Sequence, residues 1–374
     1  SSATRTTTPP GFPSAPAGGG GAAGDMGAAM RTATPPGFPS AGVSPANAVA
    51  GAGDVTNRQG GHGLAPNGAT AAFDASAAAA AIPWASLREP GRSAAVVSLA
   101  SDDNPDFRPY MEDGHRVVDP LLQQGTKKNE DTWGFFGVYD GHGGRQETEY
   151  CEAKMHEVVL GELRNLGPSC KDPAPALINA FKKVDGQLAM LGAWNSGCTA
   201  TVAVLRRQAG AAALHVANVG DSRAVLTDLL TGGVRRVSTD HRASDPAEAQ
   251  RVVEDGGIVR HGRVGGQLSV SRSLGDHHLK GVGVSCIPDV CSVHLDAAQA
   301  STGNALVIAS DGLWDALLDQ DAGEVVRNCV EAAVRRGGAE AVASSVQEQA
   351  AQTLVNLAKE RGSRDNILAL VVIF

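Results

Sequence analysis

The chain has 374 residues, of which 42% are hydrophobic, and it carries a formal net charge of -8 with a pI near 5.7. This length and apolar content are sufficient for one large domain or two ordinary domains with a substantial core. The acidic balance, together with the lack of a Lys/Arg stripe with interleaved aromatic residues, argues against a nucleic-acid partner.

The six cysteines form no Cys-x-x-Cys pair, so we expect neither a zinc module nor a disulfide framework. A reducing compartment is the default for such a sequence, and we expect a cytoplasmic protein, with the nucleus as an alternative. No apolar run reaches the length of a membrane span, and the start lacks a signal-peptide pattern. Because the first residue is Ser1, an earlier targeting or lipidation signal stays open.

Residues 1–90 are dominated by Ala, Gly, Pro, Ser and Thr, and we expect a flexible tail before a domain over residues 91–374. Within the tail, Thr-Pro-Pro-Gly-Phe-Pro-Ser-Ala occurs at residues 8–15 and again at residues 34–41. The simpler interpretation is a duplicated linker. The alternative is a short docking motif with a stiff proline backbone and an exposed aromatic ring.

The first half of the expected domain combines strands with helices. Residues 94–100 have the composition of a strand, and the apolar run at residues 135–139 predicts a buried strand that leads into Asp140. Apolar residues then recur at spacings of three and four, which predicts one helix from about Arg145 and a second after Pro175. We expect both helices to cover a sheet.

The second half begins with short β-rich runs that have no helix between them, so they can only pair antiparallel. These runs are residues 201–205, 214–219, 223–226 and 234–237. Further expected elements are a helix at 246–254, a strand at 306–309, a helix from Asp321, a last helix that includes Val342 and Leu357, and a buried strand at 367–374. Paired helices and antiparallel strands together predict a layered α+β architecture.

Acidic residues recur at the ends of these strands and in the loops beside them. They are Asp140, Asp221, Asp311, Asp365, Glu112 and Asp113. Each one alone is explained as simply by turn chemistry, since Asp-Gly commonly follows a strand. If the strand ends converge, however, the carboxylates form a cluster that only cations can neutralise, and an all-oxygen set favours Mg²⁺ or Mn²⁺ over zinc. Two such ions roughly 4 Å apart can hold a bridging water and clamp a phosphate.

Several short motifs follow one another in a recognisable order. They are Arg-Pro-Tyr-Met-Glu-Asp at 108–113, Val-Tyr-Asp-Gly-His-Gly-Gly at 138–144, Ser-Gly-Cys-Thr-Ala at 196–200, Ala-Asn-Val-Gly-Asp-Ser-Arg-Ala at 217–224, Thr-Asp-His at 239–241, Leu-Ser-Val-Ser-Arg-Ser-Leu-Gly-Asp at 268–276, Ala-Ser-Asp-Gly-Leu-Trp-Asp at 309–315 and Ser-Arg-Asp-Asn at 363–366. The series resembles that of the metal-dependent protein Ser/Thr phosphatases, the PPM or PP2C family, over about residues 93–374.

The resemblance implies a PP2C-like sandwich of two antiparallel β-sheets flanked by pairs of helices, in α-β-β-α layers. It also implies two Mg²⁺ or Mn²⁺ ions, with Asp140 bridging both and the Gly141 carbonyl binding one. The remaining residues of the implied metal site are Asp311 and Asp365 as direct ligands, Glu112 acting through bound water, Asp113 as an outer-shell or third-metal residue, and Asp221 holding a third, weaker ion.

The resemblance further implies that Arg108 grips the phosphate and that His142 protonates the leaving Ser or Thr oxygen. A planar guanidinium suits phosphoryl oxygens, and an alkoxide is a poor leaving group, so the chemistry agrees with both roles. Without the motifs, Arg108 would be an ordinary surface residue, and His142 would be a turn residue capping the helix from Arg145.

The leading hypothesis is therefore a monomeric enzyme that hydrolyses phosphoserine and phosphothreonine in phosphorylated protein substrates by attack of a metal-bridging water. A catalytically silent scaffold with the same fold is the alternative, and metal-dependent phosphodiester chemistry is a third option that the acidic pI disfavours. Gly265 and Ser273 depart from the family pattern, where Asn and Ala are expected, and neither is a proposed ligand. His277 and His278 are expected to lie in an exposed polar loop.

Overall fold

The computed structural model describes residues 82–124, 131–167 and 172–374. All of them lie within the unit Gly68–Phe374. Most of the expected tail over residues 1–90, including its repeat, falls outside the described residues. Ile82 and Trp84, which precede the expected start of the domain at residue 91, are buried in a hydrophobic core.

The first five-stranded sheet has the order β1-β15-β14-β8-β9, and all neighbouring strands pair antiparallel. Its strands are β1 (Val96–Asp102), β8 (Arg223–Asp228), β9 (Val234–Arg236), β14 (Asn304–Ala309) and β15 (Ile367–Ile373). Every residue of β15 is apolar and buried, because the strand lies between β1 and β14 and is covered on both faces. The predicted buried strand at the end of the chain is confirmed.

The second five-stranded sheet has the order β13-β7-β6-β3-β2 and is also antiparallel. Its strands are β2 (Gly114–Gln124), β3 (Asp131–Tyr139), β6 (Ala200–Gln208), β7 (Ala211–Val219) and β13 (Asp289–Leu295). The predicted antiparallel pairing of the short runs is confirmed, but β6 and β7 belong to this sheet whereas β8 and β9 belong to the first. The turn between β7 and β8 therefore crosses from one sheet to the other.

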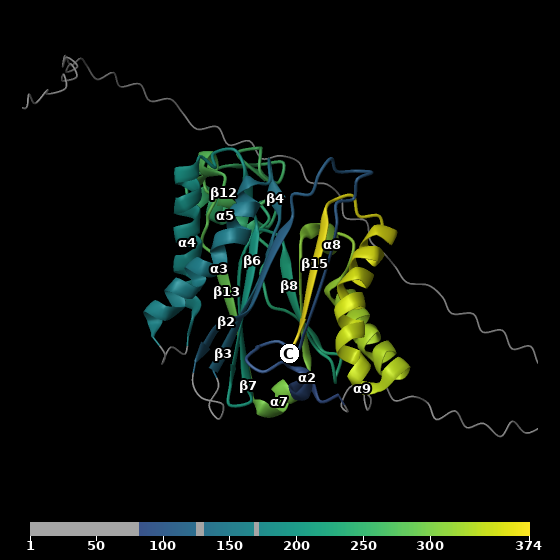
Figure 1. Cartoon of the computed structure of the whole chain (residues 1–374). Helices are drawn as coiled ribbons and strands as arrows, with labels where there is room; N and C mark the ends of the chain where they lie inside the picture. The colour runs from purple at the N-terminus through teal and green to yellow at the C-terminus, as the bar shows by residue number, and fades with distance from the viewer. Residues whose placement is uncertain (1–81, 125–130, 168–171) are drawn as a thin grey trace, which may run out of the picture. The chain divides into compact units, whose positions relative to one another are not determined.

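The described residues also form two smaller sheets. One consists of β4 (Gly141–His142), β5 (Gly197–Cys198) and β12 (Leu274–Gly275), and the other consists of β10 (Val259–Arg260) and β11 (Arg263–Val264). Helices α3 (Gln146–Leu166) and α4 (Ala174–Leu191) cover the second five-stranded sheet, and α9 (Asp319–Glu360) covers the first (Figure 1). A non-helical Gly338 divides α9 into the two helices that the sequence predicts.

The short helices are α2 (Trp84–Leu87), α5 (Pro246–Glu254), α6 (His277–Lys280), α7 (Ala297–Ser301) and α8 (Asp311–Trp314). The bounds of α5 match the prediction. Pro246 is pre-organised for the first helical turn, and the Asp245 carboxylate caps it by accepting from the amides of Ala247 and Glu248. None of the helices in the described residues combines the length and apolar character needed to cross a bilayer.

Alternating side chains of β3 show how the layers are held together. Phe135 and Tyr139 pack into the core beneath α3 and α4, while Phe136 and Val138 pack into the core between the two sheets. Burying each of these side chains contributes about 2 to 3 kcal/mol of transfer free energy. With α9 packed on the outer face of the first sheet, the layer order is α-β-β-α, and the predicted fold class is confirmed.

Two edge strands and one helix differ from the sequence-based expectation. β2 and β13 were not predicted, because both mix polar with apolar residues and only part of each is buried. The expected loop at His277 and His278 is wrong, since both residues lie in α6. His278 is exposed, whereas His277 is half-buried and its ring nitrogens lie 2.7 Å and 3.1 Å from the carbonyls of Ala193 and Asp185.

Candidate metal centre

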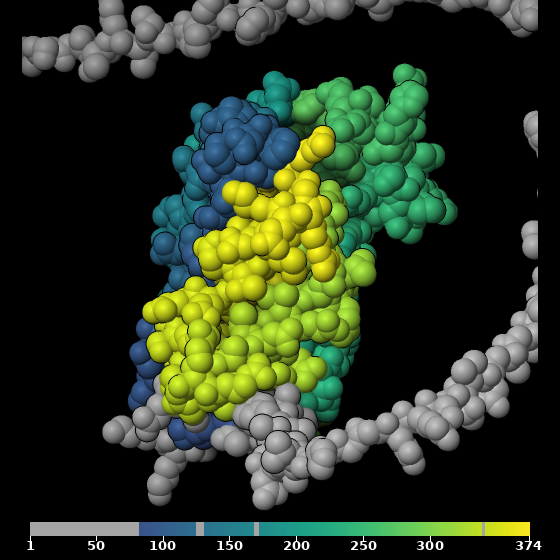
Figure 2. Space-filling view, turned by 90° about the vertical axis from the view of Figure 1, so that its right-hand side faces the viewer, coloured from purple at the N-terminus to yellow at the C-terminus, as the bar shows by residue number. Residues whose placement is uncertain are grey.

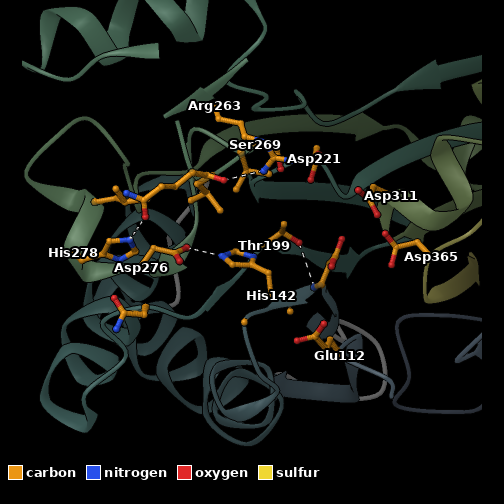
Figure 3. A pocket seen from close by; sticks show the side chains of 18 of the residues that line it. Glu112, His142, Thr199, Asp221, Arg263, Ser269, Asp276, His278, Asp311 and Asp365 are labelled. Atoms are coloured by element: carbon orange, nitrogen blue, oxygen red, sulfur yellow. Dashed lines mark hydrogen bonds and ion pairs between the residues drawn. The ribbon is translucent and has the colours of Figure 1, made fainter. Parts of the chain in front are cut away.

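A cavity of about 490 Å³ opens where strands of both large sheets end (Figure 3). Asp140 follows β3 and Asp221 follows β7, both from the second sheet. Asp311 follows β14 and Asp365 precedes β15, both from the first sheet. The cavity contains the carboxylates of Glu112, Asp140, Asp221, Asp276, Asp311 and Asp365. The strand ends therefore converge, as the cluster hypothesis requires.

Asp140, Asp221 and Asp311 form the tightest part of this cluster. Each offers a carboxylate oxygen, and these oxygens all lie within 4.8 Å of one another. Asp221 is buried, and the other two are half-buried. Among the described residues, Asp221 is the one member of the three that forms an ion pair with an arginine, since Arg242 Nε lies 3.3 Å from its Oδ2. Three neighbouring carboxylates with one nearby guanidinium leave an excess of negative charge.

The cluster raises the pKa values of its own members. Burial is the largest cause for Asp140, and the charges of Asp311, Asp113 and Asp221 add to it, so the Asp140 pKa lies well above its usual 3.8. Burial and neighbouring carboxylates likewise raise the pKa of Asp311 well above its usual value. Ionising the whole set therefore costs free energy that a bound cation would recover.

The donor set of the cavity suits hard divalent cations. The convergent groups of the cluster are all carboxylate oxygens, with no thiolate or imidazole among them. Mg²⁺ and Mn²⁺ prefer such oxygen ligands, whereas structural zinc sites use Cys and His. The cluster thus fits the cations that the sequence predicts.

The backbone around Asp140 is held by close contacts that leave no space for a side chain at the next residue. The Asp140 amide donates to Thr199 Oγ1 at 3.2 Å, and the Thr199 amide donates to the Asp140 carbonyl at 2.8 Å. A Cβ on Gly141 would lie 2.5 Å from Thr148 Oγ1 and 2.7 Å from the Glu112 carbonyl oxygen. Only glycine fits there, which keeps the Gly141 backbone close to the cluster.

Asp365 and Arg108 face each other at one side of the cavity. Arg108 Nη2 donates to Asp365 Oδ2, and both side chains are partly exposed. Asp365 lines the cavity and contributes to the raised pKa values of Asp140 and Asp311, but it lies outside the tightest group. Arg108 must therefore exchange or share its carboxylate partner in order to bind a phosphate.

Glu112 and Asp113 lie next to each other in sequence but occupy different environments. Glu112 lines the cavity, and its Oε1 accepts from the Gly144 amide at 2.8 Å. Asp113 is buried behind the cavity, where Ser310 Oγ donates to its Oδ2 at 2.6 Å. Burial raises the pKa of Asp113 to about 7, against the lowering effect of the Ser310 hydrogen bond. The lining of the cavity includes Glu112 but not Asp113.

His142 is oriented by Asp276, which comes from a distant part of the chain. His142 Nε2 lies 2.7 Å from Asp276 Oδ2 (Figure 3). Ser273 Oγ donates to the same oxygen at 2.6 Å. Burial alone lowers the pKa of His142, but the hydrogen bond and charge of Asp276 outweigh it, so the pKa lies above its usual value. Asp276 therefore stabilises the protonated imidazole relative to the neutral one.

The structure brings together most of the residues that the sequence singled out. Those that line the cavity are Arg108, Glu112, Asp140, Gly141, His142, Asp221, Asp311 and Asp365. The sequence analysis assigned no role to Asp276, Thr199 or Arg263, which line the same cavity. Asp276 carries a visible signal, since it follows Leu274-Gly275 at the end of one of the motifs, but its partner lies 134 residues away in sequence.

Comparison with known proteins agrees with this geometry. Residues 97–367 match the family model described as protein phosphatase 2C. Protein phosphatase 2C homolog 1 of Saccharomyces cerevisiae is 34% identical over 289 residues, which cover 74% of this chain and 92% of that protein. Its Schizosaccharomyces pombe namesake is 33% identical over 78% of this chain and 76% of its own length. The chain therefore belongs to the protein phosphatase 2C family.

A solved structure supports the same fold. The serine-threonine phosphatase 2C from Toxoplasma gondii superposes with a TM-score of 0.57 at 24% identity, covering 74% of this chain and 94% of that one. Membership of the family makes the chain a metal-dependent protein phosphatase, an enzyme that acts on phosphoproteins.

Proposed function

We propose that the chain hydrolyses phosphoserine and phosphothreonine in proteins at a centre of two Mg²⁺ or Mn²⁺ ions. The observation that carries the proposal is the convergence of Asp140, Asp221 and Asp311 within 4.8 Å at the shared end of both sheets. Asp140 would hold both ions, with the Gly141 carbonyl, Asp311 and Asp365 as further ligands. Glu112 would act through water, Asp221 would hold a third ion, and Asp113 would serve as an outer-shell or third-metal residue.

Such ions, when bound, activate the attacking water and neutralise the carboxylates around the phosphate. The roles of the protein side chains follow from their positions. Arg108 offers two parallel donors to phosphoryl oxygens once it turns from Asp365, and it lies on the rim of the same cavity. His142 holds a proton toward the cavity, and Asp276 fixes the ring on its Nε2 side.

The silent-scaffold alternative is not favoured, because the relatives that match most of the chain are named as phosphatases. The proposal is tested by measuring phosphate release from a phosphothreonine peptide with and without Mn²⁺, Mg²⁺ and a chelator. We expect release only with metal, and none from Asp311→Asn. The matched control is Asp106→Asn, an exposed aspartate outside the cavity lining. Release that survives chelation would overturn the proposal.

The proton-donor role of His142 has a test of its own. An alkyl phosphoester has a poor leaving group and needs a proton, whereas an aryl phosphoester with a good leaving group does not. We expect His142→Gln to lower turnover of the alkyl substrate by about a hundredfold and that of the aryl substrate far less. Equal losses on both substrates would contradict the role.

Two further expectations stay predictions. Light scattering of the purified chain tests the expectation that the protein is a monomer. Docking through the repeat at residues 8–15 and 34–41 is checked by deleting residues 1–45 and comparing the captured partners. If the captured partners are unchanged, the docking hypothesis is wrong and the repeat is a duplicated linker.

A further inference from the structure

Asp276, which orients His142, lies in an unusual backbone conformation. Its φ of 49° and ψ of 40° place it in the left-handed region, which residues other than glycine seldom adopt. The residue is buried, and its amide donates to the Ser196 carbonyl at 2.8 Å. Such a conformation persists only where neighbouring contacts fix it. The residues that hold this segment of the chain therefore also determine where the Asp276 carboxylate points.

The small sheet of β4, β5 and β12 brings the carboxylate and the imidazole together. Gly197 of β5 lies directly opposite His142 of β4 on one side and Gly275 of β12 on the other. A Cβ on Gly197 would overlap the Asp276 carboxylate and would lie 2.6 Å from the Leu274 carbonyl oxygen. Because the central position of the sheet has no side chain, the carboxylate has the space to reach the imidazole.

Asp185 of α4 contacts the chain on both sides of Asp276. On the preceding side, its Oδ1 accepts a hydrogen bond from the Gly275 amide at 3.0 Å. On the following side, Lys280 Nζ lies 2.9 Å from the same oxygen, and His277 Nε2 lies 3.5 Å from Oδ2. Asp185 is itself buried, so solvent and salt screen these contacts only weakly. One carboxylate thus holds the residues directly before and after Asp276 in the chain.

Asp185 is not among the described residues that line the cavity, so it can act on His142 only through its neighbours. Its helix, α4, packs beside β12 (Figure 1). In the space-filling view, the green chain around residues 245–280 projects beside the rest of the domain (Figure 2). Lys280 lies at the end of this segment, and its Nζ also donates to the Ser273 carbonyl at 2.6 Å. Asp185 and Lys280 therefore join α4 to the part of the chain that begins at Ser273.

We propose that Asp185 is a positioning residue that keeps the Asp276 carboxylate directed at His142. It does so by holding Gly275 and Lys280, which lie on either side of Asp276. The inference rests on the proposed function, because it assumes that His142 protonates the leaving oxygen. A proton donor is efficient only when its ring is correctly placed, so a small displacement of Asp276 slows the reaction that needs the proton. Binding of substrate and metal uses other residues and does not depend on Asp185.

The test uses the full chain with Mn²⁺, a phosphothreonine peptide as the alkyl ester and an aryl phosphoester with a good leaving group. Asp185→Ala removes all the contacts of the carboxylate, and Lys280→Gln removes one of them from the other side. The matched control is Glu162→Gln, which breaks the pair of the buried Glu162 with Lys183 between α3 and α4, outside the cavity lining. The measurements are kcat and KM for each ester, and Mn²⁺ affinity by calorimetry.

We expect kcat for the alkyl ester to fall about tenfold in Asp185→Ala and about threefold in Lys280→Gln. The aryl kcat, both KM values and the Mn²⁺ affinity should change less than about twofold, which a general loss of structure would not produce. The double variant should lose little more than Asp185→Ala alone, because both side chains act on the same segment. Glu162→Gln should leave the alkyl-to-aryl ratio of kcat unchanged.

The inference is overturned if this ratio keeps its wild-type value in Asp185→Ala and Lys280→Gln, or if it falls as much in Glu162→Gln. If Asp185→Ala does not fold, the half-buried Lys280 decides the question through Lys280→Gln alone. A wild-type protein that releases no phosphate from either ester would instead overturn the proposed function. Equal losses on both esters in His142→Gln would remove the proton-donor role, and this inference with it.

Discussion

Glu248 and the cluster of Asp140, Asp221 and Asp311 are carboxylate sites in the same domain with opposite electrostatics. Glu248 on α5 is buried, and it accepts hydrogen bonds from Arg272, Arg251 and Ser271. Burial alone would raise its pKa, but these partners lower it to about 2. In the aspartate cluster, burial and mutual repulsion raise the pKa values instead.

The difference separates a structural site from a binding site. At Glu248 the protein supplies the countercharge, so the ionised group stabilises the fold as it stands. At the aspartate cluster the protein supplies too little countercharge, so the ionised groups destabilise the fold until a cation binds.

The strongest test of this comparison is Asp140→Asn. We expect phosphate release to fall at least about a hundredfold, because a ligand shared by the proposed ions is lost. The metal-free protein should at the same time become more stable near neutral pH, with a Tm roughly a few °C higher, since one repelling charge is removed. If the metal-free variant folds but has a lower Tm than the metal-free wild type, the view that the ionised carboxylates of the cluster destabilise the metal-free protein is wrong.

Glu248→Gln should have the opposite effect on stability. Removing this carboxylate leaves Arg251 and Arg272 with less countercharge, and we expect the free energy of unfolding to fall by about 3 kcal/mol. The measurement is urea denaturation of the metal-free chain. The matched control is Glu254→Gln, an exposed glutamate on the same helix. Equal stability of the two variants would show that the network around Glu248 is not structural.

The pH dependence of metal stabilisation sharpens the comparison further. In the folded protein, the pKa values of Asp113 and Asp140 lie above their usual 3.8, at about 7 for Asp113. Folding therefore favours the protonated form of these carboxyl groups. The metal-free protein therefore loses the stability contributed by these groups as pH rises from about 4 to about 7. Bound Mn²⁺ favours the ionised form, so the increase in Tm caused by Mn²⁺ should grow between about pH 5 and pH 7.5. An increase that is the same at both values would contradict the raised pKa values.

The smallest expected effect concerns Ser273, which replaces the Ala of the family pattern. Its hydroxyl donates to Asp276 Oδ2 beside His142, so Ser273→Ala removes one hydrogen bond but leaves the His142 contact. We expect a loss of about 1 kcal/mol in unfolding free energy. The pH above which the alkyl phosphoester reaction declines should move slightly upward. Without the Ser273 hydrogen bond, the Asp276 carboxylate stabilises the positive charge of protonated His142 more strongly. A downward movement would show that Ser273 does not act through Asp276.

Much of the fold followed from local patterns. The apolar runs of β3 and β15, the 3.6-residue periodicity of α3 and α4, and the Asp245-Pro246 start of α5 are all local signals that predicted the elements observed. β2 and β13 escaped prediction because they lie at the edge of a sheet, where one side of each strand is partly exposed and its residues are mixed.

For the site, the sequence by itself determined which residue types end the strands: Asp140, Asp221, Asp311 and Asp365 each stand in a turn or at a strand end that local chemistry predicts. Only the tertiary structure decided which of them meet within 4.8 Å, that Arg108 is paired with Asp365, and that Asp276 orients His142. These contacts join residues that are far apart in the sequence, by 81 positions for Asp140 and Asp221 and by 257 for Arg108 and Asp365. Two sheets must pack together before such charges come close enough to shift one another's pKa values.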